Sequence, residues 1–259
     1  MLMFRLREGI PDIADTATID ADLDAVLARH SHVFDIGRNE LKALLAIPSI
    51  SALPEHAGDV RRCAEWCGDE MRRIGLQNVE LIETPGNPVV YGDWLGAPGA
   101  PTILFYGHYD VQPVDPLNLW ESPPFEATIR DGEIFARGSA DDKAGIACHL
   151  AAMRAFGGHP PVGVTVFVEG EEESGSPSLG ALLAAHRDKL AADVIVIADS
   201  DNWTPEVPAL TVSLRGLADC VVEVQTLDHG LHSGLWGGVV PDALTVLVRL
   251  LAGLHDDDG

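Results

Sequence analysis

Apolar and polar positions follow two rhythms along this chain, one typical of buried strands and one typical of amphipathic helices. Three largely apolar runs lie at residues 102–105, 162–168 and 193–198. Continuous runs of this length indicate buried strands, as in parallel sheets that are covered on both faces. Two more strands are expected at Val79–Ile82 and Val89–Trp94, on either side of a Pro-Gly-Asn-Pro turn.

Most of the segments between these strands have the apolar spacing of helices. Within Asp59–Ile74 the apolar residues recur every three or four positions, which is the pattern of a helix with one buried face. Further helices are expected at Asp22–His30, Arg38–Ala46 and Lys143–Phe156. The segment Ala127–Phe135 contains an Asp-Gly pair and predicts a β-hairpin. The chain is therefore expected to be an α/β protein with a mixed, largely parallel sheet flanked by helices.

The pattern changes near residue 214, where a domain boundary is predicted. Residues 1–214 would form the main domain, and residues 215–259 would begin a second one. Leu217–Thr226 has the pattern of a strand that departs from the sheet. Pro241 would occupy the first position of a helix whose leucines form one apolar stripe. A strand followed by a helix predicts the start of a small α+β unit.

Composition narrows the class of protein. The chain has 259 residues, of which 46% are apolar and 22% charged, as in soluble globular proteins. A formal net charge of -23 argues against binding to nucleic acid or to anionic membrane surfaces. The apolar patch at the N-terminus is too short for a signal peptide and no run is long enough to span a membrane, so a cytoplasmic location is expected. The four cysteines are expected to be free thiols.

Histidine and carboxylate side chains gather where the predicted strands end. His108 and Asp110 follow the first run, Glu169–Ser176 follows the second, and Asp199 follows the third. In a His-x-Asp pair the ring can bind a metal ion through one nitrogen while the carboxylate fixes the other. Carboxylates with one histidine suit zinc, manganese or cobalt. The sequence thus predicts a metal site at the carboxyl edge of the sheet.

Six motifs identify a resemblance to a known family. They occur in the order YGHYDVQP, RGSADDKAG, EGEEESGS, IADSDNW, SLRG and DHGLHSG. The sequence is similar to the dinuclear metallohydrolases that include carnosinase-type dipeptidases, acetylornithine deacetylase and succinyl-diaminopimelate desuccinylase, and it resembles the dipeptidases most. The resemblance implies a zinc-aminopeptidase-like fold, with a lid and dimerisation domain from residue 215 and a homodimer in the complete protein.

The resemblance also implies roles for particular residues. Asp141 would bridge two divalent metal ions, with Glu173 on one ion and His108 and Asp199 on the other. The ions would be zinc, or else manganese or cobalt. Because only Asp141 and Glu173 remain for one ion, the two sites are expected to differ in affinity.

Three further residues are implied to take part in catalysis. Glu172 would be the general base that takes a proton from the attacking water. Asp110 would orient His108 instead of binding metal. His232 matches a histidine that reaches across the dimer toward the substrate's carbonyl oxygen, an oxyanion-stabilising role.

Three functions stay open at the level of sequence. The first is hydrolysis of peptide bonds in dipeptides or other small peptides, and the second is deacylation of N-acyl amino acids. The third is a truncated chain that binds only metal or partner chains, because the acidic end His255–Gly259 is expected to mark a cut.

Overall fold

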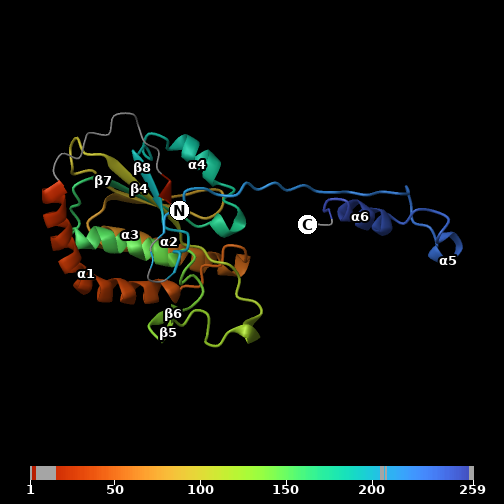
Figure 1. Cartoon of the computed structure of the whole chain (residues 1–259), viewed down its shortest axis with the longest axis horizontal. Coiled ribbons are helices and arrows are strands. Elements are labelled where there is room, and N and C mark those ends of the chain that lie inside the picture. Colours follow the sequence, from red (N-terminus) through yellow and green to blue (C-terminus); the bar gives the residue numbers. More distant parts are fainter. Residues whose placement is uncertain (1, 4–15, 205–206, 208, 257–259) are drawn as a thin grey trace. The chain divides into compact units, whose positions relative to one another are not determined.

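The computed structural model describes residues 2–3, 16–204, 207 and 209–256. The chain divides into two compact units, Met1–Ser213 and Leu214–Gly259. The division lies beside the boundary predicted at residue 214. The larger unit carries the sheet and most of the helices (Figure 1).

A six-stranded mixed sheet forms the centre of the larger unit. Its strand order is β1-β8-β4-β7-β3-β2. The three central strands β8, β4 and β7 run parallel, whereas β1, β3 and β2 pair antiparallel at the two sides. The strands are β1 (Leu2–Met3), β2 (Gln77–Ile82), β3 (Val89–Trp94), β4 (Thr102–His108), β7 (Gly163–Glu169) and β8 (Val194–Ile197). Every residue of β3 and β7 is buried, as continuous apolar runs predict.

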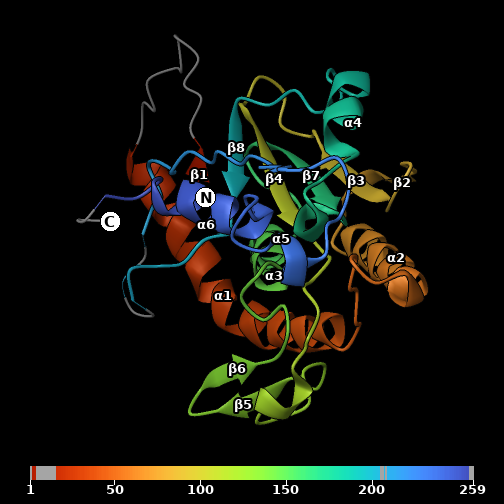
Figure 2. The same cartoon turned by 90° about the vertical axis from the view of Figure 1, so that its right-hand side faces the viewer.

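Helices cover both faces of the sheet. Figures 1 and 2 show α2 and α3 on one face, with α1 outside α3, and α4 on the opposite face. The helices are α1 (Thr16–Leu45), α2 (Ala57–Arg73), α3 (Lys143–Ala155) and α4 (Leu179–Ala185), with short 3-10 turns η1 (Pro54–His56), η2 (Leu117–Leu119) and η3 (Glu172–Ser174). Two apolar cores result, one under α2 and α3 and a smaller one under α4. The predicted α/β fold with a mixed sheet flanked by helices is confirmed.

Helix α1 differs from the prediction. Two helices, Asp22–His30 and Arg38–Ala46, were expected, but one continuous helix runs from Thr16 to Leu45. Gly37 lies inside it, and a Cβ added there would be 3.8 Å from Ala151 Cβ on α3. An alanine would also fit there, so the helix continues through Gly37 because α1 packs along α3, and this tertiary packing outweighs the low helix propensity of glycine.

The predicted hairpin forms from β5 (Thr128–Arg130) and β6 (Glu133–Phe135). Its two turn residues, Asp131 and Gly132, have φ values of 51° and 89°. Positive φ at both central residues is what a two-residue hairpin turn requires, and Asp-Gly supplies it at low cost.

The smaller unit contains two helices, α5 (Ser233–Trp236) and α6 (Ala243–Ala252). The strand expected at Leu217–Thr226 is wrong, because these residues form no strand in the structure. The helix prediction was right in kind, but Asp242 is the N-cap, so Pro241 precedes the helix. Of the acidic end, Asp257, Asp258 and Gly259 lie outside the described residues.

Candidate metal centre

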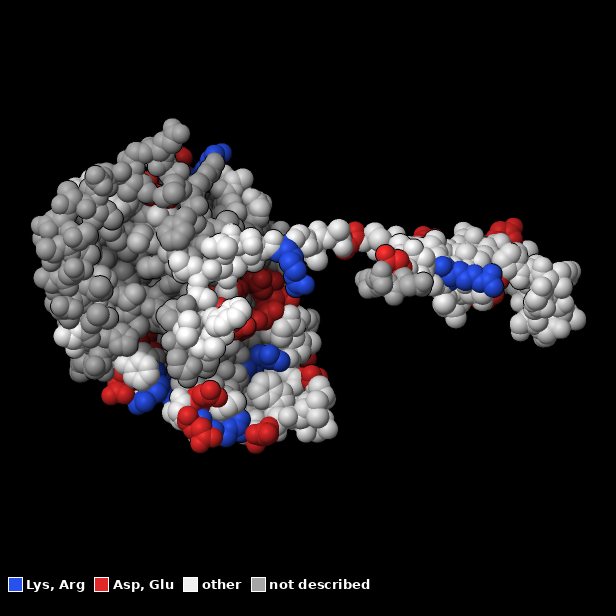
Figure 3. Space-filling view, viewed as in Figure 1, with Lys and Arg blue, Asp and Glu red and all other residues white. Residues whose placement is uncertain are grey.

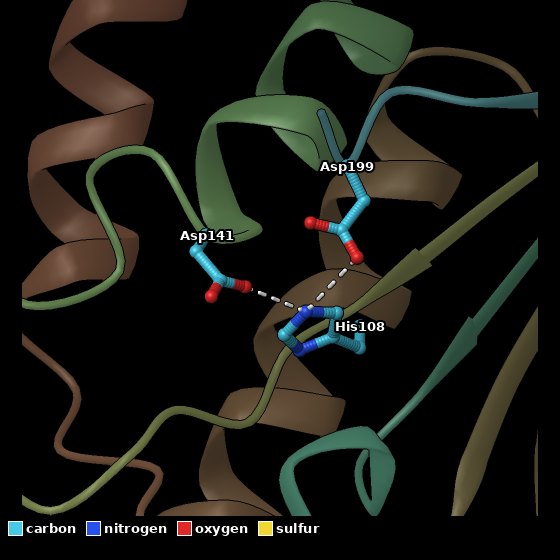
Figure 4. A group of neighbouring side chains, drawn as sticks. All are labelled: His108, Asp141 and Asp199. Carbon is cyan, nitrogen blue, oxygen red and sulfur yellow. Dashed lines mark hydrogen bonds and ion pairs between the residues drawn. The ribbon is translucent and has the colours of Figure 1, made fainter. Parts of the chain in front are cut away.

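His108 is the last residue of β4 and is completely buried. Its Nε2 atom lies 2.9 Å from Asp141 Oδ1 and 3.6 Å from Asp199 Oδ2. One ligand atom from each of these three residues lies within 4.8 Å of the others (Figure 4). Within the described part of the chain, no other group of three or more such residues lies close enough to hold a metal ion.

The topology of the sheet explains why these residues meet. Strands β4 and β8 are parallel neighbours, so their carboxyl ends lie at the same edge. His108 ends the first strand, and Asp199 comes shortly after the second. Asp141 lies in the loop just before α3, and its side chain is 65% exposed, which leaves the site open to solvent. The sequence had assigned the same three residues to one ion.

The carboxylates around His108 favour its protonated form. Burial alone would lower the pKa of its imidazole, but the nearby carboxylates of Asp110 and Asp199 and the charge of Asp142 raise that pKa to about 11. The same contact with His108 lowers the pKa of Asp199. The surrounding carboxylates therefore favour a positive charge at this point.

Asp110 lies behind the ring and is also completely buried. Its Oδ2 atom accepts hydrogen bonds from Ser51 Oγ at 2.6 Å and from the Glu173 main-chain N–H at 3.2 Å. Its Oδ1 atom lies 3.4 Å from His108 Nδ1 and has no hydrogen-bond partner among the described atoms. The geometry fits a carboxylate that fixes the ring while the opposite nitrogen faces Asp141 and Asp199.

The Glu172–Glu173 pair lies on η3, directly after β7. Glu172 Oε2 is 3.9 Å from His108 Nε2, whereas Glu173 Oε2 accepts a hydrogen bond from Gln112 Nε2 at 2.7 Å. Burial raises the pKa of both carboxyls. Glu172 thus faces the cluster, and Glu173 is not part of the three-residue group.

Asp142 is a site residue that sequence reasoning missed. It is completely buried, and its Oδ2 atom accepts a hydrogen bond from the His108 main-chain N–H at 3.1 Å. Burial raises the pKa of its carboxyl to about 7, against the opposing charge of His108. A Cβ on Gly145 would lie 2.0 Å from Asp142 Oδ1, so a glycine is needed to make room for this acid. Its position as the second Asp of the Asp-Asp-Lys motif was the sequence feature that could have identified Asp142 as a site residue.

The acids Glu169 and Glu171 shape the loop that carries η3. Glu169 accepts hydrogen bonds from Tyr106 Oη at 2.6 Å and from Ser176 Oγ at 2.9 Å. Glu171 accepts from two main-chain N–H groups, those of Asn87 and Ser178. These two acids hold the loop in place.

His232 lies in the smaller unit. Its Nδ1 atom accepts a hydrogen bond from Gly234 N at 3.1 Å and thereby caps α5. Its predicted part in stabilising the substrate's carbonyl oxygen stays a prediction.

Acidic side chains line a hollow on the face of the larger unit seen in Figure 3.

None of the described helices has the length and apolar character needed to cross a membrane. An α/β unit with a histidine and two carboxylates at the carboxyl edge of its sheet has the arrangement of a metal-binding protein.

Comparison with known proteins identifies the family. The family model described as Peptidase family M20/M25/M40 matches residues 104–236. The chain belongs to this family, which confirms the resemblance drawn from its motifs.

Several relatives are dipeptidases. A cysteinylglycine-S-conjugate dipeptidase of Corynebacterium striatum is 36% identical over 85% of this chain and 49% of its own length. A Beta-Ala-His dipeptidase of Rattus norvegicus is 32% identical over 85% of this chain and 48% of its own. The solved structure of the di-peptidase Dug1p from Saccharomyces cerevisiae superposes with a TM-score of 0.68 at 25% identity, covering 92% of this chain and 53% of that one. The chain thus spans about half the length of the curated relatives it matches.

Proposed function

We propose that this chain supplies the metal-binding half of a metal-dependent hydrolase that cleaves dipeptides or other small peptides. The observation that carries this proposal is the meeting of His108, Asp141 and Asp199 at the carboxyl edge of the parallel strands, with Glu172 beside them. Membership of a peptidase family and the similarity to known dipeptidases support the choice of a peptide substrate.

The residues present fit a divalent metal ion. One imidazole and two carboxylates, delivered by three separate segments, give the donor set that zinc, manganese and cobalt accept. Asp110 behind His108 matches the carboxylate that typically orients a metal-binding histidine. A second ion would be held by only two protein ligands, Asp141 and Glu173, whereas the first would have three. The second site should therefore bind its ion with lower affinity.

Glu172 is the proposed general base. A divalent ion, when bound, makes water more acidic and polarises a carbonyl group. Glu172 would accept the proton of the attacking water and pass it to the departing amine. Burial raises the pKa of its carboxyl, which favours uptake of that proton. His232 is proposed to stabilise the substrate's carbonyl oxygen in a homodimer of the complete protein.

Zinc titration and a single substitution test this function. Calorimetric titration of the chain at neutral pH should show one tight zinc site, which His108→Ala removes, and one weaker site. In the complete protein, zinc-dependent hydrolysis of Cys-Gly or β-Ala-His should exceed hydrolysis of N-acetyl amino acids. In Glu172→Gln of the complete protein, turnover should fall by ~10²–10⁴-fold at unchanged zinc affinity, because a general base contributes a factor of this size.

Three outcomes would contradict the proposal. A chain that binds no zinc would refute the metal centre, and a complete protein that binds zinc but hydrolyses no dipeptide would refute the activity. Full turnover in Glu172→Gln, or loss of its zinc, would refute the role of this residue. Preference for N-acetyl amino acids would instead identify a deacylase.

A further inference from the structure

We propose that Ser51 is a positioning residue of the metal centre. Through its hydrogen bond to Asp110 it fixes the position of the His108 ring relative to the Glu172–Glu173 turn. Ser51 comes from the loop after α1 and is 59 residues away from Asp110 in sequence. The inference rests on the proposed function only in so far as that function needs a metal ion at His108.

The loop that carries Ser51 is attached to the segment after β4. Ile50 forms a parallel β-bridge with Val111, and Val111 N donates a hydrogen bond to Ser49 O at 3.0 Å. Ser49 Oγ donates to Tyr109 O at 2.6 Å. The β-bridge and the main-chain hydrogen bond of Ser49, which need no side-chain hydroxyl, place the next serine, Ser51, beside the carboxylate of Asp110.

The hydroxyl of Ser51 has one hydrogen, and it is donated to Asp110 Oδ2 at 2.6 Å. Ser51 Oγ also lies 3.0 Å from Ser174 Oγ on η3. Because Ser51 has no second hydrogen, Ser174 must be the donor in that contact. A directed chain of hydrogen bonds therefore runs from Ser174 through Ser51 to Asp110.

This chain decides which oxygen of Asp110 is left for His108. Oδ2 receives both Ser51 Oγ and the Glu173 main-chain N–H. Oδ1 is buried without any other partner among the described atoms and lies 3.4 Å from His108 Nδ1. The main-chain oxygen of Asp110 lies 3.1 Å from the same ring nitrogen. Both acceptors keep a proton on Nδ1, so the ring is held in the orientation in which a metal ion could replace the proton on Nε2.

The contact from Glu173 N gives this chain of hydrogen bonds a second effect. Asp110 Oδ2 joins the end of β4 to η3, so the position of Glu172 follows that of His108. Without the Ser51 hydroxyl, the carboxylate of Asp110 can rotate, and both the ring orientation and the η3 contact loosen. Loss of a direct partner of a metal-binding histidine typically weakens metal binding by ~10–100-fold. Ser51 acts through such a partner, Asp110, so its loss should weaken binding by up to ~10-fold.

The test compares two serines of the same loop in the full chain. Ser51→Ala should weaken zinc binding by up to ~10-fold in calorimetric competition with a chelator. Ser49→Ala removes a hydrogen bond of equal length that does not touch Asp110. It should lower the melting temperature but keep the zinc affinity of the parent chain. Ser51→Thr retains a hydroxyl and should restore binding, and Ser174→Ala should weaken it less than Ser51→Ala does.

A second measurement needs no metal. Amide hydrogen exchange at Glu173, followed by NMR in the zinc-free chain, should be faster in Ser51→Ala than in the parent chain or in Ser49→Ala. Equal zinc affinity and equal exchange in Ser51→Ala and the parent would overturn the inference, as would equal losses in both alanine variants. A parent chain that binds no zinc would refute the proposed function, while exchange at Glu173 would still decide whether Ser51 holds η3.

Discussion

Helix α6 is more apolar than helix α3, yet only α3 has buried side chains. In α3 the side chains of Ile146, Leu150 and Met153 are each at most 2% exposed, because they pack against the sheet. In α6 the side chain of Leu244 is 66% exposed, and no described residue of the smaller unit is buried. A helical pattern therefore predicts a helix in both units, but it predicts a core only where a sheet face is available to receive the helix.

The first prediction tests this difference with two leucine truncations. Leu150→Ala on α3 should lower the free energy of unfolding by about 2–5 kcal/mol, because it leaves a cavity in the core. Leu254→Ala in the smaller unit removes a side chain that is 67% exposed and should change it by less than about 0.5 kcal/mol. Urea denaturation gives both values. Equal losses in the two variants would show that the smaller unit has a core of its own.

The second prediction uses a buried histidine of the larger unit. His149 stacks on Phe105 with ring centroids 4.4 Å apart, and its Nε2 atom is buried without a partner among the described atoms. Burial lowers the pKa of its imidazole to about 4, below the usual value of 6.5. Between pH 6.5 and 4 the unfolded chain therefore binds the proton and the folded chain does not, so stability falls as the pH falls through this window.

Urea unfolding of the parent chain should therefore show a loss of about 2 kcal/mol from this residue between roughly pH 7 and 5. His149→Phe should remove that part of the pH dependence. The same slope in His149→Phe and the parent would mean that His149 is protonated in the folded chain.

Sequence patterns predicted the parts of the fold that depend on local periodicity and on the direction of the strands. His108 and Asp199 could be placed together because each follows an apolar run, and the ends of parallel strands share one edge. The Asp131-Gly132 hairpin was predictable because its turn needs two residues with positive φ.

Contacts between distant segments could not be predicted in this way. Ser51 reaches Asp110 because its loop pairs with the residues after β4. The sequence of neither segment predicts that the two segments pair. Asp142 is buried against the backbone of His108, in space provided by Gly145. The alternation in Leu217–Thr226 was interpreted as a strand, but a strand needs a hydrogen-bonding neighbour, and none of the described residues provides one.

The last prediction concerns the cap of α6, where the expected effect is smallest. Asp242 Oδ2 accepts hydrogen bonds from Thr245 N at 2.7 Å and from Thr245 Oγ1 at 2.9 Å, and these bonds lower the pKa of its carboxyl. Because α6 has no buried side chain among its described residues, its stability depends on local contacts such as this cap. Asp242→Ala should therefore reduce the helical circular dichroism signal, whereas Asp242→Asn, which keeps an acceptor oxygen, should preserve it. Lowering the pH through the pKa of Asp242 should mimic the alanine variant in the parent chain. An unchanged signal in Asp242→Ala would show that α6 is held by contacts other than its cap, and would bring its behaviour close to that of α3.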